Sequence, residues 1–300
     1  MTTSEQVRRA DELPAITKFA DVFRQIFKIA PLEKFLSNAM NRPANPRWFG
    51  RFAPNYYQYT ERAFRYAIRH GLKWELDLRE FHDWRVYFSA PVPARERLLK
   101  LIRPGDVVMD VGANIGEYAL VFAQKIGPSG RVVCFEPFHP NLARLRRNVE
   151  INPLMPVTIV PKALSDATTK LAMRTADGLN FGTAHVCAKN ETAGDSIESV
   201  RLDDLNLGIA PEKIRLLKID VEGWEMHVLR GGEKFIRAAK PVIAIELFDP
   251  HLRRQGSSAR EILEWLRRNG YRMEGVLDGK TITPENDADG CQLDVLAIPA

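Results

Sequence analysis

The chain has 300 residues and a mass of 34.1 kDa, enough for one large domain or for a domain of roughly 200 residues with an appendage. Its 45% hydrophobic and 27% charged residues match an ordinary globular protein and exclude disorder for most of the chain. No apolar run approaches the roughly 18 residues that span a bilayer, and the polar first residues lack the apolar core of a secretion signal, so we expect a cytoplasmic protein without a transmembrane segment.

The net charge of +5 is unevenly distributed. Residues 1–90 contain 15 Lys and Arg against 10 Asp and Glu, and the remaining residues contain 28 of each kind. The same front third holds 17 of the 27 aromatic residues. We therefore expect an aromatic, basic extension over 1–90 and a second domain over 91–300, divided near Pro91-Val92-Pro93. The three cysteines are far apart, and their spacing predicts neither a disulfide framework nor a zinc site.

The extension is expected to be mainly helical. Apolar residues recur every three or four positions over 13–30, which predicts one amphipathic helix. A loop follows over 41–59, and we expect a second helix over 60–70, ended by Gly71. Apolar and charged residues then alternate over 72–79, which predicts a half-buried strand.

Beyond Pro93 the pattern changes to short apolar runs separated by helical stretches. After a helix over 95–102, the runs predict strands over 107–111, 131–136, 157–160, 214–219 and 242–247. Two more strands are expected over 271–277 and 292–298, after a helix whose start is marked by the capping box of Ser258 and Glu261. This alternation predicts a doubly wound, mostly parallel, seven-stranded α/β sheet of the Rossmann-like class. The long interval 161–211 is expected to hold extra short strands.

The turn after the first of these strands has the chemistry of a ligand site. Asp110 closes the strand, and Gly112 and Gly116 form the turn into the next helix, at the sheet edge where such folds bind ligands. Asn114 and Glu117 stand where a dinucleotide fingerprint needs glycines, so pyrophosphate binding is disfavoured. An acidic residue here suits a cationic ligand without phosphate. One strand later, Glu136 occupies the position from which a carboxylate can accept both ribose hydroxyls of a nucleoside.

Further carboxylates end the fourth and fifth strands. Asp220 and Glu222 follow the fourth strand, and Glu246 lies near the end of the fifth. Lys218 and Glu246 interrupt apolar runs, where ionic groups are costly unless they are paired or used. The alternative is that these acids form an ion-paired structural rim.

Four motifs together give the chain a resemblance to a known family: residues 108–118 (VMDVGANIGEY), 135–137 (FEP) with Asn141, 202–205 (LDDL), and 217–225 (LKIDVEGWE) with 228–231 (VLRG). The chain resembles the FkbM-type methyltransferases, a class I S-adenosylmethionine-dependent family, over about residues 72–250. The resemblance implies that Asp110, Gly112 and Gly116 line the methionine side of the cofactor, that Glu136 holds its ribose, and that Ser165 and Asp166 lie near its adenine. Its motifs add Ala113, Asn114, Tyr118, Pro137 and Asn141 to the expected cofactor site.

The resemblance also implies methylation of a hydroxyl group, often on a sugar, a glycan or another small-molecule natural product, and in some members methylation of nitrogen. Such a reaction needs alignment of the nucleophile and removal of its proton. We expect Asp220 to be the base, with Glu222 and Glu246 as alternates or partners. A divalent metal bridging these acids is left open, and His185 and His227 are further candidates for the base.

Two alternative functions are compatible with parts of the sequence. A nucleic-acid methyltransferase agrees with the sequence pI of about 9.1, but the second domain is charge-balanced and contains no recognised RNA-binding module. A binding protein on a degenerate methyltransferase fold would bind the cofactor without turnover. Two interpretations of the extension are possible. It is a lid whose aromatic rings stack on the substrate, with Trp48, Tyr56, Tyr57 and Tyr59 as candidates, or it is a helical layer whose aromatic residues form a small second core and whose basic residues face solvent. Homo-oligomerisation is left open.

Overall fold

A computed structural model describes residues 22–41, 47–88, 92–175, 181–187 and 194–300. The chain divides into two compact units, Met1–Pro91 and Val92–Ala300. Among the described residues, no helix is long and apolar enough to cross a membrane.

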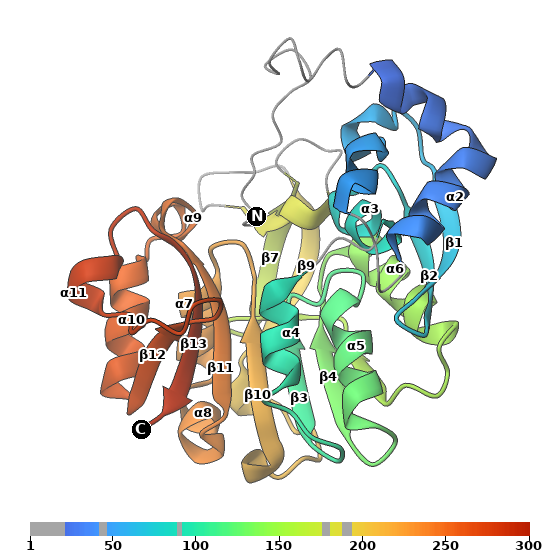
Figure 1. Ribbon diagram of the computed structural model, residues 1–300. Helices are drawn as coiled ribbons and strands as arrows, with labels where there is room; N and C mark the ends of the chain where they lie inside the picture. The colour runs from blue at the N-terminus through green and yellow to red at the C-terminus, as the bar shows by residue number, and fades with distance from the viewer. Residues whose placement is uncertain (1–21, 42–46, 89–91, 176–180, 188–193) are drawn as a thin grey trace. The chain divides into compact units, whose positions relative to one another are not determined.

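The second unit is built on the predicted seven-stranded sheet (Figure 1). Its spatial order is β12-β13-β11-β10-β3-β4-β5, and only β13 runs antiparallel to its neighbours. The doubly wound prediction is therefore confirmed. The strands are β3 (Val107–Val111), β4 (Arg131–Phe135), β5 (Val157–Val160), β10 (Ile214–Ile219), β11 (Val242–Phe248), β12 (Tyr271–Gly275) and β13 (Gln292–Pro299).

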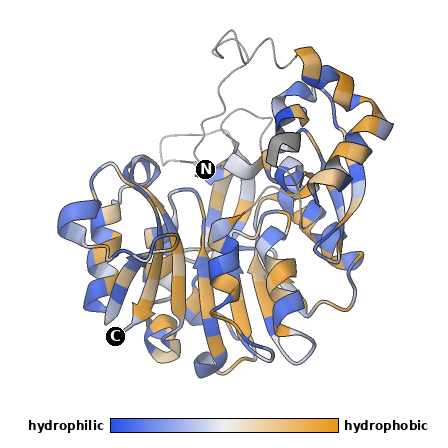
Figure 2. Ribbon diagram, viewed as in Figure 1, coloured by the Kyte–Doolittle hydropathy of each residue, from blue (hydrophilic) through white to orange (hydrophobic). Residues whose placement is uncertain are grey.

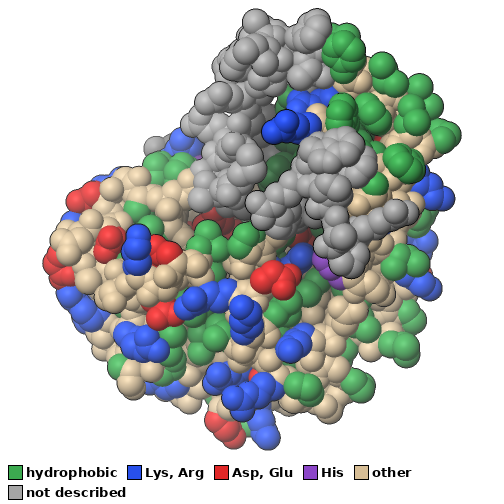
Figure 3. All heavy atoms as spheres, viewed as in Figure 1, with side chains coloured by type: hydrophobic (Ala, Val, Ile, Leu, Met, Phe, Trp, Pro, Cys, Tyr) green, Lys and Arg blue, Asp and Glu red, His purple; other side chains and the backbone are tan. Residues whose placement is uncertain are grey.

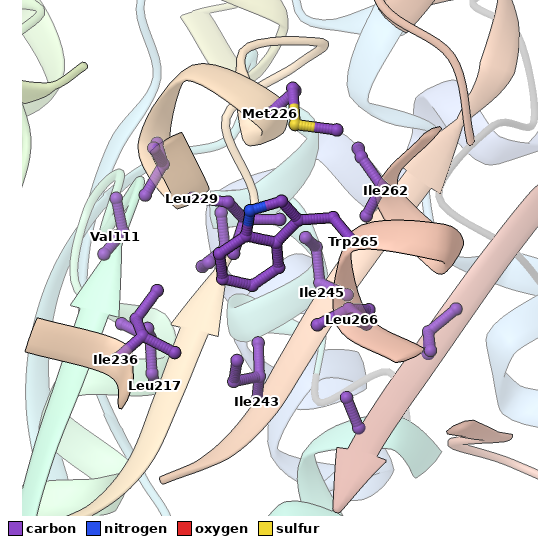
Figure 4. Packing of buried hydrophobic residues seen from close by; sticks show 14 of the residues in the cluster. Val111, Leu217, Met226, Leu229, Ile236, Ile243, Ile245, Ile262, Trp265 and Leu266 are labelled. Carbon is purple, nitrogen blue, oxygen red and sulfur yellow. The ribbon is translucent and has the colours of Figure 1, made fainter. Parts of the chain in front are cut away.

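Helices cover both faces of this sheet because successive side chains of each strand point to opposite faces. In β3, Val108 belongs to the apolar core shared with α4 (Pro93–Leu99), α5 (Glu117–Ile126) and α6 (His139–Glu150). Met109 and Val111 belong to the opposite core, where Trp265 packs among aliphatic side chains of β10 and β11 (Figure 4). The hydropathy colouring in Figure 2 shows these central strands as the most apolar part of the unit.

The second core is covered by the later helices α7 (Glu225–Gly231), α8 (Glu233–Ala239) and α10 (Ala259–Arg268). One half of the capping box predicted for α10 is present, since Ser258 Oγ accepts a hydrogen bond from the backbone N–H of Glu261. Two short helices, α9 (Asp249–Arg254) and α11 (Pro284–Asp287), complete the C-terminal part.

The interval 161–211 contains the extra strands expected there. They form a separate four-stranded sheet in the order β6-β9-β7-β8. Its strands are β6 (Ala163–Leu164), β7 (Thr169–Arg174), β8 (His185–Val186) and β9 (Asp195–Val200), and the 3-10 turns are η5 (Phe181–Thr183), η6 (Leu202–Asp204) and η7 (Pro211–Lys213).

In the first unit, the helix predicted over 60–70 is wrong. Residues Phe64–Arg69 form strand β1, which pairs antiparallel with the correctly predicted β2 (Leu72–Asp77). His70 and Gly71 both have positive φ, 52° and 78°, as two-residue hairpin turns require. The hairpin places Arg65 and Arg69 on its inner face, where Arg65 pairs with the buried Glu33, and leaves the side chains of Phe64, Tyr66 and Ile68 exposed.

The single helix predicted over 13–30 is only partly present where the chain is described, because residues 22–24 are α-helical and the helix does not continue to residue 30. Its residues 13–21 lie outside the described part, residues 25–28 form the 3-10 turn η2 (Gln25–Lys28), and a new helix α2 (Ala30–Met40) begins with Pro31 in its first turn. Phe23, Ile26 and Phe35 are more than half exposed, and Figure 3 shows hydrophobic side chains gathered on this unit. The remaining elements are η3 (Arg47–Phe52), η4 (Tyr56–Gln58) and α3 (Phe81–Tyr87).

Of the aromatic residues considered for a lid, Tyr59 is buried and its hydroxyl donates a hydrogen bond of 2.9 Å to Glu33. Tyr56 packs edge-on against Tyr57 and Phe81. The side chain of Trp48 lies outside the described residues.

Candidate active site

The site lies where β3 and β10 are neighbours, because the chain leaves β3 toward β4 on one side and returns through β10 on the other. Ligands of doubly wound folds bind at the carboxyl ends of the strands at such a switch point. Gly112 has φ of +80°, and a Cβ atom on it would lie 1.9 Å from the carbonyl oxygen of Asp220. The turn after β3 thus packs directly on the backbone that follows β10, which only glycine permits.

A buried lysine joins two of the predicted site residues. Lys218 Nζ lies 3.4 Å from Oδ1 of Asp110 and 3.2 Å from Oδ2 of Asp220. The same ammonium lies 4.8 Å from the ring centroid of Tyr118. Burial would lower the pKa of Lys218, but the two carboxylates outweigh it and raise the pKa, so the lysine stays charged. Asp110 and Asp220 are therefore held together around one cation.

Glu136 is buried at the end of β4, and its carboxylate organises the neighbouring loops. Oε2 accepts the backbone N–H of Asn114 at 2.8 Å, and Oε1 accepts that of Phe138, beyond Pro137, at 2.9 Å. Burial raises the pKa of Glu136 to about 7, although both hydrogen bonds favour the charged form. Each oxygen keeps a second lone pair, so the carboxylate can still accept hydrogen bonds from the hydroxyls of a ligand.

The backbone around Asn114 completes this part of the site. Asn114 adopts a left-handed conformation with φ of 50°, next to the buried Ala113. Gly116 caps α5 with φ of +90°, and a Cβ on it would lie 2.7 Å from the side chain of Leu145. Asn141, in the first turn of α6, donates to the carbonyl of Phe181, and its buried Oδ1 has no hydrogen-bond partner among the described residues.

Ser165 and Asp166 are engaged with α7. Trp224 Nε1 donates to Ser165 Oγ at 3.2 Å, and His227 Nδ1 lies 2.9 Å from Asp166 Oδ2. The hydrogen bond with His227 outweighs desolvation and lowers the pKa of Asp166. The imidazole of His227 also stacks on the Trp224 ring at 3.8 Å. The contact of Ser165 and Asp166 with adenine stays a prediction.

The remaining carboxylates lie along the carboxyl edge of the sheet. Glu246 of β11 pairs in register with Asp294 of the antiparallel β13, and Asp220 directly follows Ile219, which pairs with the residue before Glu246. Burial, and then the charge of Asp220, raise the pKa of Asp294. Glu246 and Asp294 are therefore paired on β11 and β13, and Asp220 directly follows the neighbouring strand β10.

The loop after β10 is held by Glu225, a residue that the sequence analysis did not single out for the site. Glu225 is buried, and its Oε1 accepts the backbone N–H groups of Val221 and Gly223 at 3.1 and 3.2 Å. Burial raises the pKa of Glu225 to about 8 against the effect of these hydrogen bonds. Within this loop, Glu222 lies beside His251 of α9, at 3.1 Å between Oε2 and Nδ1.

Sequence reasoning also missed His251 and Asp294. His251 could have been found, because it closely follows a strand whose carboxyl end lies at the site. Asp294 could not, because its place depends on the register of an antiparallel strand. His185, by contrast, lies in β8, with Nδ1 3.0 Å from the carbonyl oxygen of Thr183.

The donor set fits S-adenosylmethionine better than a phosphate-bearing cofactor. Carboxylates at Asp110 and Glu136 suit a sulfonium, an ammonium and ribose hydroxyls, and would repel phosphate. The unpartnered Oδ1 of Asn141 adds a buried acceptor near Phe138. Among the described residues, no group of three or more His, Cys, Asp or Glu side chains is arranged to hold a metal ion.

Comparison with known proteins agrees with this geometry. The sequence is similar to several known methyltransferases, among them the following three. The 2-O-methyltransferase NoeI of Sinorhizobium fredii is 27% identical over 205 residues, covering 63% of this chain and 83% of NoeI. The 31-O-demethyl-FK506 methyltransferase FkbM of Streptomyces tacrolimicus is 36% identical over 160 residues, covering 44% of this chain and 61% of that protein. The hexuronic acid methyltransferase AglP of Haloferax volcanii is 28% identical over 148 residues, covering 49% of this chain and 58% of AglP.

The chain thus spans less than two thirds of the length of two of these relatives. The sequence model of a protein family, the methyltransferase FkbM domain, matches residues 110–273, which is more than half of the chain. That segment begins at Asp110 and contains Glu136, Lys218 and Asp220. The chain belongs to the FkbM methyltransferase family.

Proposed function

We propose that this protein methylates a hydroxyl group of a sugar or of another small-molecule natural product, with S-adenosylmethionine as the methyl donor. The observation that carries the proposal is the convergence of Asp110, Glu136 and Asp220 at one switch point, inside the segment that matches the family. The names of NoeI and FkbM specify methylation of oxygen and that of AglP specifies a hexuronic acid, which supports an oxygen acceptor on a sugar or natural product.

In this proposal the chain's own residues first hold the cofactor. Glu136 accepts hydrogen bonds from the ribose hydroxyls, while the turn of Gly112 and Gly116 lets the ligand approach bare backbone. The ion pair of Asp110 and Lys218 lies beside the methionine moiety of the cofactor. Ser165 and Asp166, linked to Trp224 and His227, lie near the adenine. When bound, S-adenosylmethionine supplies a methyl group already activated by its sulfonium.

The chain then has to align the acceptor and remove its proton. Asp220 is the proposed carboxylate facing the acceptor hydroxyl, with Glu222 and Glu246 as its neighbours on the same edge. Lys218 pairs with Asp220, which suits Asp220 to positioning the acceptor through its charge rather than to holding the hydroxyl's only proton. Uptake of the proton by Asp220 would cost part of that ion pair.

Calorimetry tests the cofactor first. Titration of ligand-free protein with S-adenosylmethionine is expected to show micromolar binding, while NADH, with its pyrophosphate, is expected not to bind. Absence of S-adenosylmethionine binding in a folded sample would overturn the proposal.

Transfer of a labelled methyl group then tests the acceptor, with a methyl hexoside, a methyl hexuronoside and a hydroxylated macrolide as probes. Each probe with its hydroxyls already methylated is the matched control. Transfer to the free hydroxyl compound alone supports the proposal. Transfer to RNA but to none of these probes would contradict it.

A further inference from the structure

His251 and Glu222 form a pair at the carboxyl edge of the sheet that neither the fold nor the ion pair of Lys218 requires. Glu222 lies in the loop after β10, and His251 lies in α9, which directly follows β11 (Figure 1). His251 Nδ1 is 3.1 Å from Glu222 Oε2, and the two side chains are 31% and 30% exposed. The pair is therefore ordered by a hydrogen bond yet accessible to a ligand.

The backbone of Glu222 is strained. Its φ is 53°, one of four positive values among the described non-glycine residues. A left-handed conformation is unfavourable for a residue with a Cβ, and strain of this kind concentrates at functional sites. The hydrogen bonds from the N–H groups of Val221 and Gly223 to Glu225 hold the loop in this shape.

The loop also packs directly on α9. A Cβ on Gly223 would lie 2.8 Å from the carbonyl oxygen of His251, so the two segments meet without an intervening side chain. Phe248 packs edge-on against the imidazole, at 4.4 Å and 77° between the rings. These contacts fix the ring with Nδ1 toward Glu222.

This orientation leaves the other nitrogen available. No described residue forms a hydrogen bond with Nε2 of His251. A carboxylate that accepts Nδ1–H holds the neutral imidazole in the tautomer whose Nε2 carries the free lone pair. Asp220, in contrast, already has the ammonium of Lys218 as a partner.

We propose that Nε2 of His251 takes the proton of the acceptor hydroxyl, and that Glu222 is the positioning residue that sets the tautomer. The proposal rests on the function proposed above. The hydroxyl oxygen forms the new bond to the methyl carbon, and the electron pair of the broken carbon–sulfur bond stays on the sulfur. The hydroxyl proton passes to Nε2 and from there to water.

The tautomer can be tested without any acceptor. Long-range ¹H–¹⁵N spectra of the whole protein, assigned with His251→Asn, are expected to show neutral His251 protonated on Nδ1. Glu222→Asn tolerates the left-handed backbone and shortens the side chain, so protonation is expected to shift toward Nε2. His82→Asn, in α3, is the control. Protonation of His251 on Nε2 in the unmodified protein would overturn the proposal, whatever the acceptor screen gives.

Kinetics with whichever of the three probes accepts the methyl group test the catalytic role. His251→Ala is expected to lower kcat by about 10²–10⁴-fold, as for loss of a general base, with unchanged calorimetric affinity for S-adenosylmethionine. Added imidazole should restore part of the rate in His251→Ala and none in Asp220→Asn. An unchanged kcat, or a loss of cofactor affinity in His251→Ala, would overturn the role of His251 while leaving the proposed function intact.

Discussion

The ammonium of Lys218 lies 3.4 Å from Oδ1 of Asp110, a carboxylate completely buried on the neighbouring parallel strand. The two residues are direct partners in the register of β3 and β10. Burying a charged pair costs desolvation free energy, so such pairs are often found at functional sites. This pair lies at the turn to which we assign the cofactor. It also fixes Asp220, which shares the same ammonium.

Lys218→Met should destabilise the protein strongly, because it leaves two carboxylates without their cation. Breaking a buried pair from one side costs about 3–5 kcal/mol. For a domain of this size we expect a fall in Tm of roughly 10 °C, measured by calorimetry. Lys280→Met, at a lysine side chain that is 84% exposed, is the control and should change Tm little. Equal Tm values for the two variants would contradict the role of Lys218.

Gly112→Ala should damage both the fold and cofactor binding, because the new Cβ would overlap the carbonyl oxygen of Asp220 at 1.9 Å. Gly127→Ala is a matched control, since Gly127 also has positive φ but has no atom within 4 Å of the Cβ position. Gly127→Ala should therefore show only the conformational cost of about 1–3 kcal/mol. Denaturant unfolding and calorimetry with S-adenosylmethionine measure the difference. Equal losses would mean that the close approach at Gly112 is unimportant.

Glu136→Ala should weaken cofactor affinity by about 1–3 kcal/mol, through lost hydrogen bonds to a charged acceptor. The N–H groups of Asn114 and Phe138 would also lose their acceptor, so the loops that carry them should loosen. Calorimetric titration measures the affinity, with the exposed Glu150→Ala as control. An affinity equal to that of the unmodified protein would discard the assignment of Glu136 to the ribose.

Asp220→Asn should leave cofactor affinity nearly unchanged and depress turnover. The amide keeps the size of the side chain but loses the charge that pairs with Lys218 and that would orient the acceptor hydroxyl. The affinity for S-adenosylmethionine and kcat should both be measured on the same preparation. A parallel loss of both would place Asp220 in the cofactor site or in the structural core instead.

Glu225 should make stability depend on pH. Burial raises its pKa in the folded state to about 8, from about 4.3 in an unfolded chain. The folded state therefore binds this proton more tightly than the unfolded state does. Protonation of Glu225 stabilises the fold fully below about pH 4, and this stabilisation is lost progressively as the pH rises to about 8. Glu225→Gln should show a smaller decrease in Tm between pH 5 and 8 than the unmodified protein. An unchanged dependence of Tm on pH would contradict the raised pKa of Glu225. Glu212→Gln, at an exposed position, is the control.

The sequence alone determined the sheet and predicted the glycine turn after β3. Short apolar runs between helical stretches define parallel strands because burial on both faces removes polar positions from them, as in β3 and β10. The order Asp110, Gly112 and Gly116 predicted the tight turn after β3, because positive φ and close backbone approach demand glycine. The same local logic failed over 60–70, where hairpin pairing overrode a pattern that alone favoured a helix.

Only the tertiary structure decided which charges meet. Lys218 could be recognised as a residue that needs partners, but its sharing between Asp110 and Asp220 depends on the register of two strands that lie far apart in the sequence. The antiparallel β13 brings Asp294 opposite Glu246, and the packing of α9 on Gly223 brings His251 to Glu222. The physical reason is that periodicity encodes which face a residue occupies, whereas the neighbour across that face is set by nonlocal packing.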